Sequence, residues 1–268
     1  MKKYFFLSLM SSVVIFNSCN STDENEIITD PVEQRILLSK VTTVYYDNPA
    51  SPQTTVSTLE YNNQGQLTKT VSLGESSIIE YNSSGKPFKI NHYKADGTLD
   101  YYSSFSYNGE NLTNIKAIYD ETSLNRTINY TYSNGKVANS TLCQTENCSN
   151  PIISTYTYNG DNITVETSEM SGGISSSNKR EYLYDNQLNP YTFTNKYFRI
   201  MMGGAYAMSK NNYASEKISY KDSAGNWVQN QQIIYDITYN SAQLPTQVIG
   251  KSTNGTNYVK YNYEYILQ

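Results

Sequence analysis

The sequence predicts an all-β fold: an antiparallel up-and-down meander of about 18 strands, curled or closed into a soluble barrel-like sheet. Tyrosine is the first reason, because there are 27 tyrosines in 268 residues and this residue suits the half-buried face of a strand. The second is a phrase that recurs mostly every 25 or 26 residues. The third is that no stretch of a dozen residues has the apolar spacing of a helix.

The recurring phrase is a tyrosine, a short polar turn and an aliphatic residue. It reads Tyr-Asn-Gly-Glu-Asn-Leu over 107–112 and returns at 132–137 and 158–163. Asn-Gly and related pairs accept the positive φ that tight hairpin turns require. Each copy therefore joins two antiparallel strands, and the regular spacing is typical of a repeat array.

Alternation within the strands predicts which face is buried. In 258–267, valine, tyrosine and leucine occupy the odd positions, whereas the even positions include Lys260 and Glu264. This pattern favours tyrosine rings that form the core face, with hydroxyls reaching water or backbone; the alternative is a sugar-binding platform. A sheet this large must curl or close, and an open twisted sheet is the second architecture to consider.

A membrane-spanning barrel is a rival architecture. It needs an apolar outer band with aromatic residues mainly at two girdles. Here tyrosine occurs along the strands, and the opposite face carries lysine and glutamate. We therefore expect a soluble barrel that is tethered to a membrane.

Residues 1–18 have the pattern of a signal peptide, with Lys2 and Lys3 ahead of a short apolar run. The ending Asn-Ser-Cys19 resembles the cleavage box of bacterial lipoproteins, which implies cleavage before Cys19 and acylation of that residue, whose several acyl chains would anchor the protein stably. The alternative is an ordinary secretory signal with an incidental cysteine. In the lipoprotein interpretation, residues 19–33 are the lipidated Cys and a disordered tether. Acidic residues over 20–26 resemble surface-export signals of Bacteroidetes lipoproteins, or form a solvated spacer.

Charge narrows the range of partners. Removal of residues 1–18 leaves 18 basic and 24 acidic side chains, a formal charge of −6. This balance argues against nucleic acid and against electrostatic docking on anionic lipid. The membrane would be a partner through the lipid anchor only, and a glycan or a protein is the further partner to consider. Residues 34–268 suit a single β-repeat domain.

Cys143 and Cys148 enclose a four-residue loop. In an exported protein such a pair predicts a disulfide across a hairpin mouth. Free thiols are the alternative. A metal site is disfavoured, because two thiols without a nearby histidine or a second pair make a poor ligand set.

The repeat is interrupted by an insertion near 185–212. This insertion is either a loop packed on the barrel mouth or a binding element. Its aromatic and methionine side chains lie outside the phase of the repeat, and such side chains adapt to irregular contacts. By elimination, we expect ligand binding here, by Tyr191, Phe193, Tyr197, Phe198, Met201, Met202 and Tyr206.

Three phrases carry a family resemblance: the tyrosine-turn-leucine phrase over 61–67, Tyr-Asp-Asn-Gln-Leu-Asn-Pro-Tyr over 184–191, and Ser-Lys-Asn-Asn over 209–212. They resemble Bacteroidetes lipoproteins of a domain-of-unknown-function class. The resemblance covers most of 35–268 and implies tyrosine-rich hairpin repeats and a porin-like fold. The repeats also look like a short relative of the YD repeats of Rhs-type shells, although Tyr-Asp is mostly Tyr-Asn here. The resemblance brings no catalytic residues.

No reaction can be assembled from the sequence. His92 is the single histidine, and no Ser-His-Asp or Cys-His arrangement forms around it. There is no phosphate loop and no metal-ligand cluster, so we expect no cofactor, no metal and no enzymatic activity. We predict a non-catalytic, lipid-anchored binding or structural module of the outer membrane, facing the periplasm or the cell surface. The alternative is a glycan-binding or glycan-hydrolysing envelope protein, whose paired carboxylates would be recognised only in space.

Overall fold

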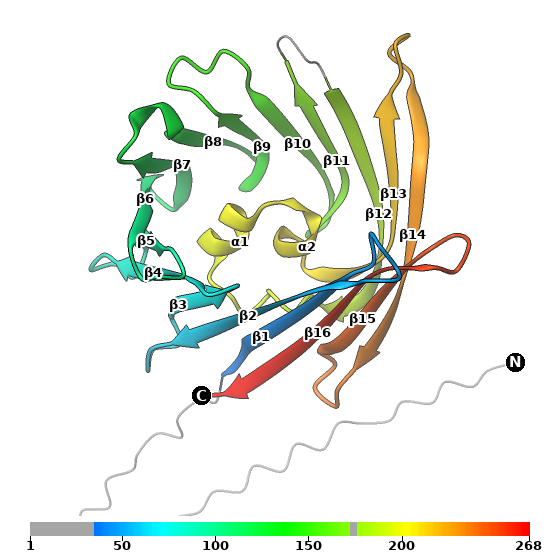
Figure 1. The fold of residues 1–268 in the computed structure, drawn as a ribbon, viewed down its shortest axis with the longest axis horizontal. Coiled ribbons are helices and arrows are strands. Elements are labelled where there is room, and N and C mark those ends of the chain that lie inside the picture. Colours follow the sequence, from blue (N-terminus) through cyan, green and yellow to red (C-terminus); the bar gives the residue numbers. More distant parts are fainter. Residues whose placement is uncertain (1–34, 172–175) are drawn as a thin grey trace, which may run out of the picture. The chain divides into compact units, whose positions relative to one another are not determined.

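The structure is a computed structural model that describes residues 35–171 and 176–268. These residues form a closed antiparallel barrel in which every strand pairs with its neighbours in sequence and β1 pairs with β16 (Figure 1). The predicted antiparallel up-and-down meander is therefore confirmed, and of the two forms expected for it, curled or closed, the sheet has the closed one. The predicted signal peptide, Cys19 and tether lie outside the described residues.

The described residues contain 16 strands. Their bounds are β1 Ile36–Tyr45, β2 Gln53–Tyr61, β3 Leu67–Ser72, β4 Glu75–Tyr81, β5 Pro87–Tyr93, β6 Leu99–Asn108, β7 Asn111–Tyr119, β8 Arg126–Ser133, β9 Lys136–Cys143, β10 Ile152–Asn159, β11 Asn162–Met170, β12 Ser176–Leu188, β13 Asn211–Lys221, β14 Trp227–Tyr239, β15 Pro245–Ser252 and β16 Asn257–Leu267. The expected number, about 18, is slightly too high. The insertion replaces strand over 189–210, and β12 and β14 each run for 13 residues.

The recurring phrase forms the predicted hairpin, with a β-bulge beside it. In the β6–β7 hairpin, Asn108 pairs with Asn111, and Gly109 in the turn has a φ of 57°. The register shifts just before Tyr107, so that Leu112 and Ile115 are both buried. The same shift precedes the closing tyrosines of β2, β4, β8, β10, β12 and β14. Bulges of this kind are common at barrel rims, where they re-aim side chains.

Hydroxyls of the closing tyrosines hold this rim together. The Tyr107 hydroxyl donates to the carbonyl of Pro87, which opens the preceding strand, and Tyr132 does the same to Leu112. Six such bonds, of 2.5–2.8 Å, are made by Tyr61, Tyr81, Tyr107, Tyr132, Tyr184 and Tyr265. Each ring packs inside while its polar end satisfies a backbone acceptor at the rim.

The insertion folds inside the barrel as a plug, which we define as residues 189–210. It contains two short helices, α1 (Lys196–Met202) and α2 (Gly204–Met208), which Figure 1 shows within the ring of strands. Asn195 caps α1 by accepting the amide N–H of Tyr197 at 2.9 Å, as an N-cap residue does. No helix in the described part of the chain is long and apolar enough to cross a membrane.

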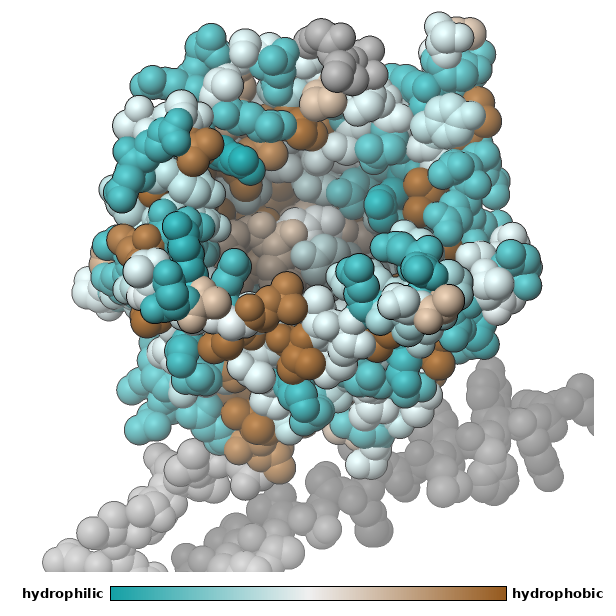
Figure 2. Space-filling view, in the orientation of Figure 1, coloured by the Kyte–Doolittle hydropathy of each residue, from teal (hydrophilic) through white to brown (hydrophobic). Residues whose placement is uncertain are grey.

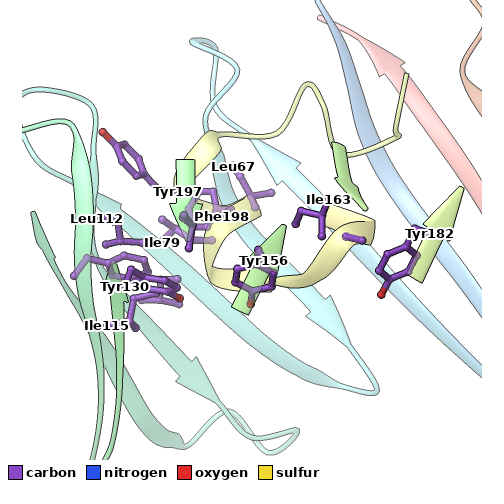
Figure 3. Packing of buried hydrophobic residues seen from close by; sticks show 14 residues of the cluster. Leu67, Ile79, Leu112, Ile115, Tyr130, Tyr156, Ile163, Tyr182, Tyr197 and Phe198 are labelled. Carbon is purple, nitrogen blue, oxygen red and sulfur yellow. The ribbon is translucent and has the colours of Figure 1, made fainter. Parts of the chain in front are cut away.

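The plug supplies the centre of the larger apolar core. Tyr197 and Phe198, 3% and 2% exposed, belong to one buried cluster with inward-facing residues of the wall, including Leu112 and Tyr130 (Figure 3). The Tyr197 ring meets the Tyr107 ring edge-on at 4.9 Å. The plug is also fixed by polar bonds: Ser209 accepts the amide N–H of Ile163, and the Lys210 amide donates to the carbonyl of Asp161.

The outward face of the barrel carries ion pairs between neighbouring strands. Lys40 and Glu264 face each other across β1 and β16 at 2.8 Å, and Glu60 and Lys69 across β2 and β3 at 3.3 Å. Further pairs occur at Glu80–Lys89, Glu181–Lys217 and Asp236–Lys251. Exposed pairs such as these add little stability, but their lysines and carboxylates interrupt any apolar belt around the wall.

Candidate functional site: a tyrosine-lined cavity beside the plug

One side of the barrel interior is hollow. Between the plug and the strands β1 and β12–β16 lies a cavity of about 530 Å³, and the space-filling view shows the molecule open at its centre (Figure 2). A cavity of this size falls in the range of small-molecule sites. Eight tyrosines line it: Tyr45, Tyr191, Tyr206, Tyr213, Tyr235, Tyr258, Tyr261 and Tyr263.

These tyrosines converge because of strand periodicity and the plug. Tyr261 and Tyr263 occupy alternate positions of β16, so both rings face inward, and they stack with their centroids 6.2 Å apart. Tyr191 comes from the plug and meets the Tyr263 ring edge-on at 6.5 Å. Burial raises the pKa of Tyr213 and Tyr263 well above the usual value. Tyr213 and Tyr263 therefore stay neutral, and the lining as a whole presents both flat apolar faces and hydroxyls.

A charged pair marks the polar part of the cavity. Arg180 on β12 donates to Glu216 on β13, and the Tyr235 hydroxyl donates to the other carboxylate oxygen of Glu216 at 2.8 Å. The Glu216 side chain is only 5% exposed, whereas the Arg180 side chain is 44% exposed. The buried carboxylate is thus fully engaged, and the guanidinium remains accessible from the cavity. Asn189 and Asn212 add amides to the lining.

A second carboxyl lies beside this pair. Glu166 on β11 lines an adjoining cavity together with Arg180 and Glu216. Burial raises the pKa of Glu166, and the Tyr182 hydroxyl donates to its carboxyl at 3.3 Å. Two carboxyls in different environments are the arrangement that acid–base hydrolysis requires. Neither residue stood out in the sequence, because Glu166 and Glu216 are separated by 50 positions and approach only through the pairing of β11, β12 and β13.

Gly250 makes room for one of the lining rings. It faces Tyr235 across β14 and β15, and a Cβ built on it would lie 2.8 Å from that ring and 3.1 Å from Ile233 and Val259. No side chain fits at that distance. Glycine therefore allows Tyr235 to lie across the strand and reach Glu216, which is a backbone approach that strand glycines permit.

The structure divides the predicted ligand-binding residues into two groups. Tyr191 and Tyr206 line the tyrosine-lined cavity, and Met202 and Tyr206 line the adjoining one. Tyr197, Phe198 and Met201 instead pack in the core, and Phe193 lies at the surface, 42% exposed. The insertion therefore contributes Tyr191, Met202 and Tyr206 to cavity walls, and tyrosines of β1, β13, β14 and β16 also line the tyrosine-lined cavity. Ligand binding by these residues stays a prediction.

His92 points inward between two serines. Its Nδ1 lies 2.8 Å from the Ser77 hydroxyl and its Nε2 lies 3.1 Å from that of Ser103. The ring stacks on Tyr101 at 4.1 Å, and burial lowers the pKa of His92 to about 4. Among the described residues, the hydrogen-bond partners of the imidazole are these two serines and include no carboxylate.

Cys143 and Cys148 are joined by a disulfide bond, with their Cα atoms 4.6 Å apart. The bond closes the loop between β9 and β10, at the rim opposite the closing tyrosines. It lies away from the cavity lining. Its place in the fold is that of a clamp on a long hairpin.

Comparison with solved structures identifies relatives in fold. No family model matches the sequence, and no curated protein matches it. Among solved structures, a porin-like protein from Bacteroides uniformis ATCC 8492 is similar with a TM-score of 0.55 and 14% identity, over 85% of this chain and 96% of that one. A porin-like protein from Bacteroides vulgatus ATCC 8482 is similar with a TM-score of 0.53 and 12% identity, over 87% and 99% of the two chains. The chain thus has a porin-like barrel fold, as the resemblance implied; the lipoprotein class and the YD-like repeat stay predictions.

Proposed function

We propose that this protein is a non-catalytic barrel of the bacterial cell envelope, anchored by lipid at Cys19, that binds a saccharide in the tyrosine-lined cavity. The observation that carries the proposal is the cavity itself, where eight tyrosines surround the Arg180–Glu216 pair. A filled interior would have favoured a purely structural module. An interior with a lined void favours binding.

The chemistry of the lining suits a polyhydroxylated ring. Tyrosine rings offer flat apolar faces, while their hydroxyls bond to polar groups of a ligand. Arg180, whose side chain is 44% exposed, adds directional donors beyond the one bonded to Glu216, and these would orient sugar hydroxyls. A purely apolar ligand would cover the guanidinium without giving it a partner, and a buried polar group without a partner is costly.

The outer wall supports an envelope protein that is tethered rather than inserted. A transmembrane barrel requires an apolar outer band, whereas here Lys40, midway along β1, forms an ion pair with Glu264 of β16 on the outward face. Porin-like neighbours from Bacteroides support a place in the envelope. The lipid at Cys19 would then provide the membrane attachment.

The binding experiment uses a glycan array followed by calorimetry on the purified barrel. Tyr206→Ala removes a plug residue that is 40% exposed and lines both cavities, so we expect loss of glycan binding with the fold retained. Tyr102→Ala is the matched control, because Tyr102 packs against Lys89 on the outward face. Identical array profiles for wild type and Tyr206→Ala would contradict the proposal.

Glycan hydrolysis is the second candidate, on the strength of Glu166 and Glu216 in one cavity lining. Both carboxyls are engaged, Glu216 by Arg180 and Tyr235 and Glu166 by Tyr182, which supports binding over turnover. We expect no release of chromophore from aryl glycosides. Turnover of an aryl glycoside by the wild type that is lost in Glu166→Gln would favour glycan hydrolysis over binding as the function.

The anchor is tested separately. Cys19→Ala should release the protein from the membrane fraction or leave it unprocessed, because acylation would no longer occur. The released barrel should remain in solution without detergent. Membrane retention of Cys19→Ala, or aggregation in the absence of detergent, would contradict the tethered barrel.

A further inference from the structure

A further cavity lies against other residues of the plug. It has a volume of about 440 Å³ and opens at the rim of the closing tyrosines, between the plug, β8–β10 and the turn before β11. None of its lining residues is shared with the tyrosine-lined cavity. The apolar part of its lining includes Tyr132, Tyr158, Ile200 and Met208.

Positive charge gathers around this cavity. Lys136, Lys196, Arg199 and Lys210 line it, and Asp161 is the only carboxylate among the lining residues that the structure describes. Asp161 is paired with Lys136 at 2.9 Å. Lys196 pairs with Glu110 at 3.0 Å, but Glu110 is shared with Lys86 and with the Tyr197 hydroxyl. The local balance is therefore positive, although the chain as a whole carries a formal charge of −4.

Arg199 differs from the three lysines because its charged group is hydrogen-bonded to backbone carbonyls of the plug. Its guanidinium is half-buried and donates to the carbonyls of Ala207, Met208 and Ser209 at 2.7–3.0 Å. Within 35–171 and 176–268 it forms no ion pair. Burial lowers the pKa of Arg199, and a buried cation without a carboxylate is costly unless an anion approaches it.

The tyrosine bonds at the rim are interrupted at this same cavity. Tyr132 and Tyr184 donate their hydroxyls to strand-opening carbonyls. The Tyr158 hydroxyl, at the equivalent position of β10, has no hydrogen-bond partner among the residues that the structure describes. The repeat geometry thus leaves one donor unused, next to an arginine and three lysines.

We infer that this cavity binds the oxyanion of a small acidic organic molecule, of the class of sugar carboxylates, between Tyr158 and the cations of the plug. The oxyanion would accept from the Tyr158 hydroxyl, from the free side of the Arg199 guanidinium and from Lys210, whose exposed ammonium has no partner in the described chain. The ring of such a molecule would lie against Tyr132, Ile200 and Met208. A cavity of this volume is far larger than a bare inorganic ion needs.

The test is calorimetry of the full mature chain with glucuronate, with glucose as the neutral counterpart and with inorganic sulfate. Glucuronate should bind saturably and more weakly at high salt, and glucose should not compete with it. Lys210→Gln and Tyr158→Phe should each weaken glucuronate binding about tenfold, the ratio expected for one lost charge-assisted hydrogen bond. Lys94→Gln, in a turn at the opposite rim, should leave the affinity unchanged.

Three results would overturn the inference. They are the absence of saturable glucuronate binding, an unchanged affinity in both Lys210→Gln and Tyr158→Phe, and a Lys210→Gln effect confined to vesicles with anionic lipid. Tyr206→Ala separates this site from the proposed saccharide site, because Tyr206 lines the tyrosine-lined cavity and the adjoining one but not this cavity. Loss of glycan binding in Tyr206→Ala with normal glucuronate binding would show two independent sites.

Discussion

The two sides of the barrel interior use the same tyrosine-rich pattern for different ends. On the side of β3–β12, inward residues pack against Phe198 and Tyr197 of the plug in one continuous core. On the side of β1 and β13–β16, a smaller cluster around Ile233 and Val259 leaves a cavity whose walls are tyrosine rings. The strands of both sides alternate in the same way, so the position of the plug makes the difference.

An inward-facing tyrosine is therefore not, by its position in a strand alone, either a core residue or part of a ligand site. Tyr107 is core because α1 covers its ring and Pro87 accepts its hydroxyl. Tyr261 also faces inward from its strand, but the plug leaves space in front of it. The two-residue period of a strand decides that the ring faces inward, and the residues of the plug that pack on it decide whether it is buried in the core or lines a cavity.

The largest expected effect tests the packed side. Phe198→Ala should lower the free energy of unfolding by about 3–5 kcal/mol, because it opens a cavity at the centre of the larger core. Phe193→Ala, in the same plug but exposed, should change it by less than about 0.5 kcal/mol. Urea unfolding of both variants checks this. Equal effects would mean that the plug does not organise the core.

The next effect tests the hollow side. Gly250→Ala should cost about 1–3 kcal/mol, because the added methyl must displace the Tyr235 ring. It should also weaken glycan binding, since Tyr235 would lose its place beside Glu216. Thr246→Ala on the same strand, with an exposed hydroxyl bond, is the control for the same unfolding and binding measurements. An unchanged free energy of unfolding for Gly250→Ala would show that the neighbouring side chains can move to accommodate the added methyl group.

A smaller effect distinguishes two tyrosines of the same repeat. Tyr132→Phe should lose about 1 kcal/mol, the usual net value of one hydrogen bond, because its hydroxyl donates to Leu112. Tyr158→Phe should leave the stability unchanged, because its hydroxyl has no partner in the described part of the chain. Chemical denaturation of the two variants side by side is the measurement. A loss for Tyr158→Phe equal to that of Tyr132→Phe would contradict the interrupted pattern of rim bonds.

The last expected effect is a pH dependence in the wall of the packed side. The pKa of His92 falls from 6.5 to about 4 on folding, so between these values the unfolded chain binds more protons than the folded one. Stability should therefore fall as the pH drops through this window, and the loss should be complete below about pH 4. The difference in urea midpoint between wild type and His92→Gln at pH 7 and pH 4.5 isolates this effect from titrating carboxylates. A pH-independent difference would contradict it.

Much of the barrel wall could be predicted from sequence. The phrase that starts at Tyr107 predicts a hairpin because Asn-Gly turns demand positive φ, and the register of β6 and β7 agrees. The bulge before each closing tyrosine could not be predicted, because it becomes visible only when two strands are paired. For the same reason the number of strands was overestimated, since the length of β12 depends on its pairing with β13.

The candidate site was predicted only in part. The insertion attracted attention because its aromatic residues leave the phase of the repeat, and Tyr191 and Tyr206 do line the cavity. Phe198 follows the same rule yet belongs to the core. Arg180 and Glu216 gave no signal, because a lone arginine and a lone glutamate in polar strands resemble any other outward residue.

Local chemistry therefore determined the antiparallel meander, the inward face of the tyrosines and the place where the repeat is interrupted, because turn conformations and a period of two are properties of short segments. Only the tertiary structure decided that the sheet closes between β1 and β16, that the insertion turns inward as a plug, and that a void remains on one side of it. Those outcomes depend on how much volume the inward side chains fill around a closed ring, which is a sum over residues far apart in the chain.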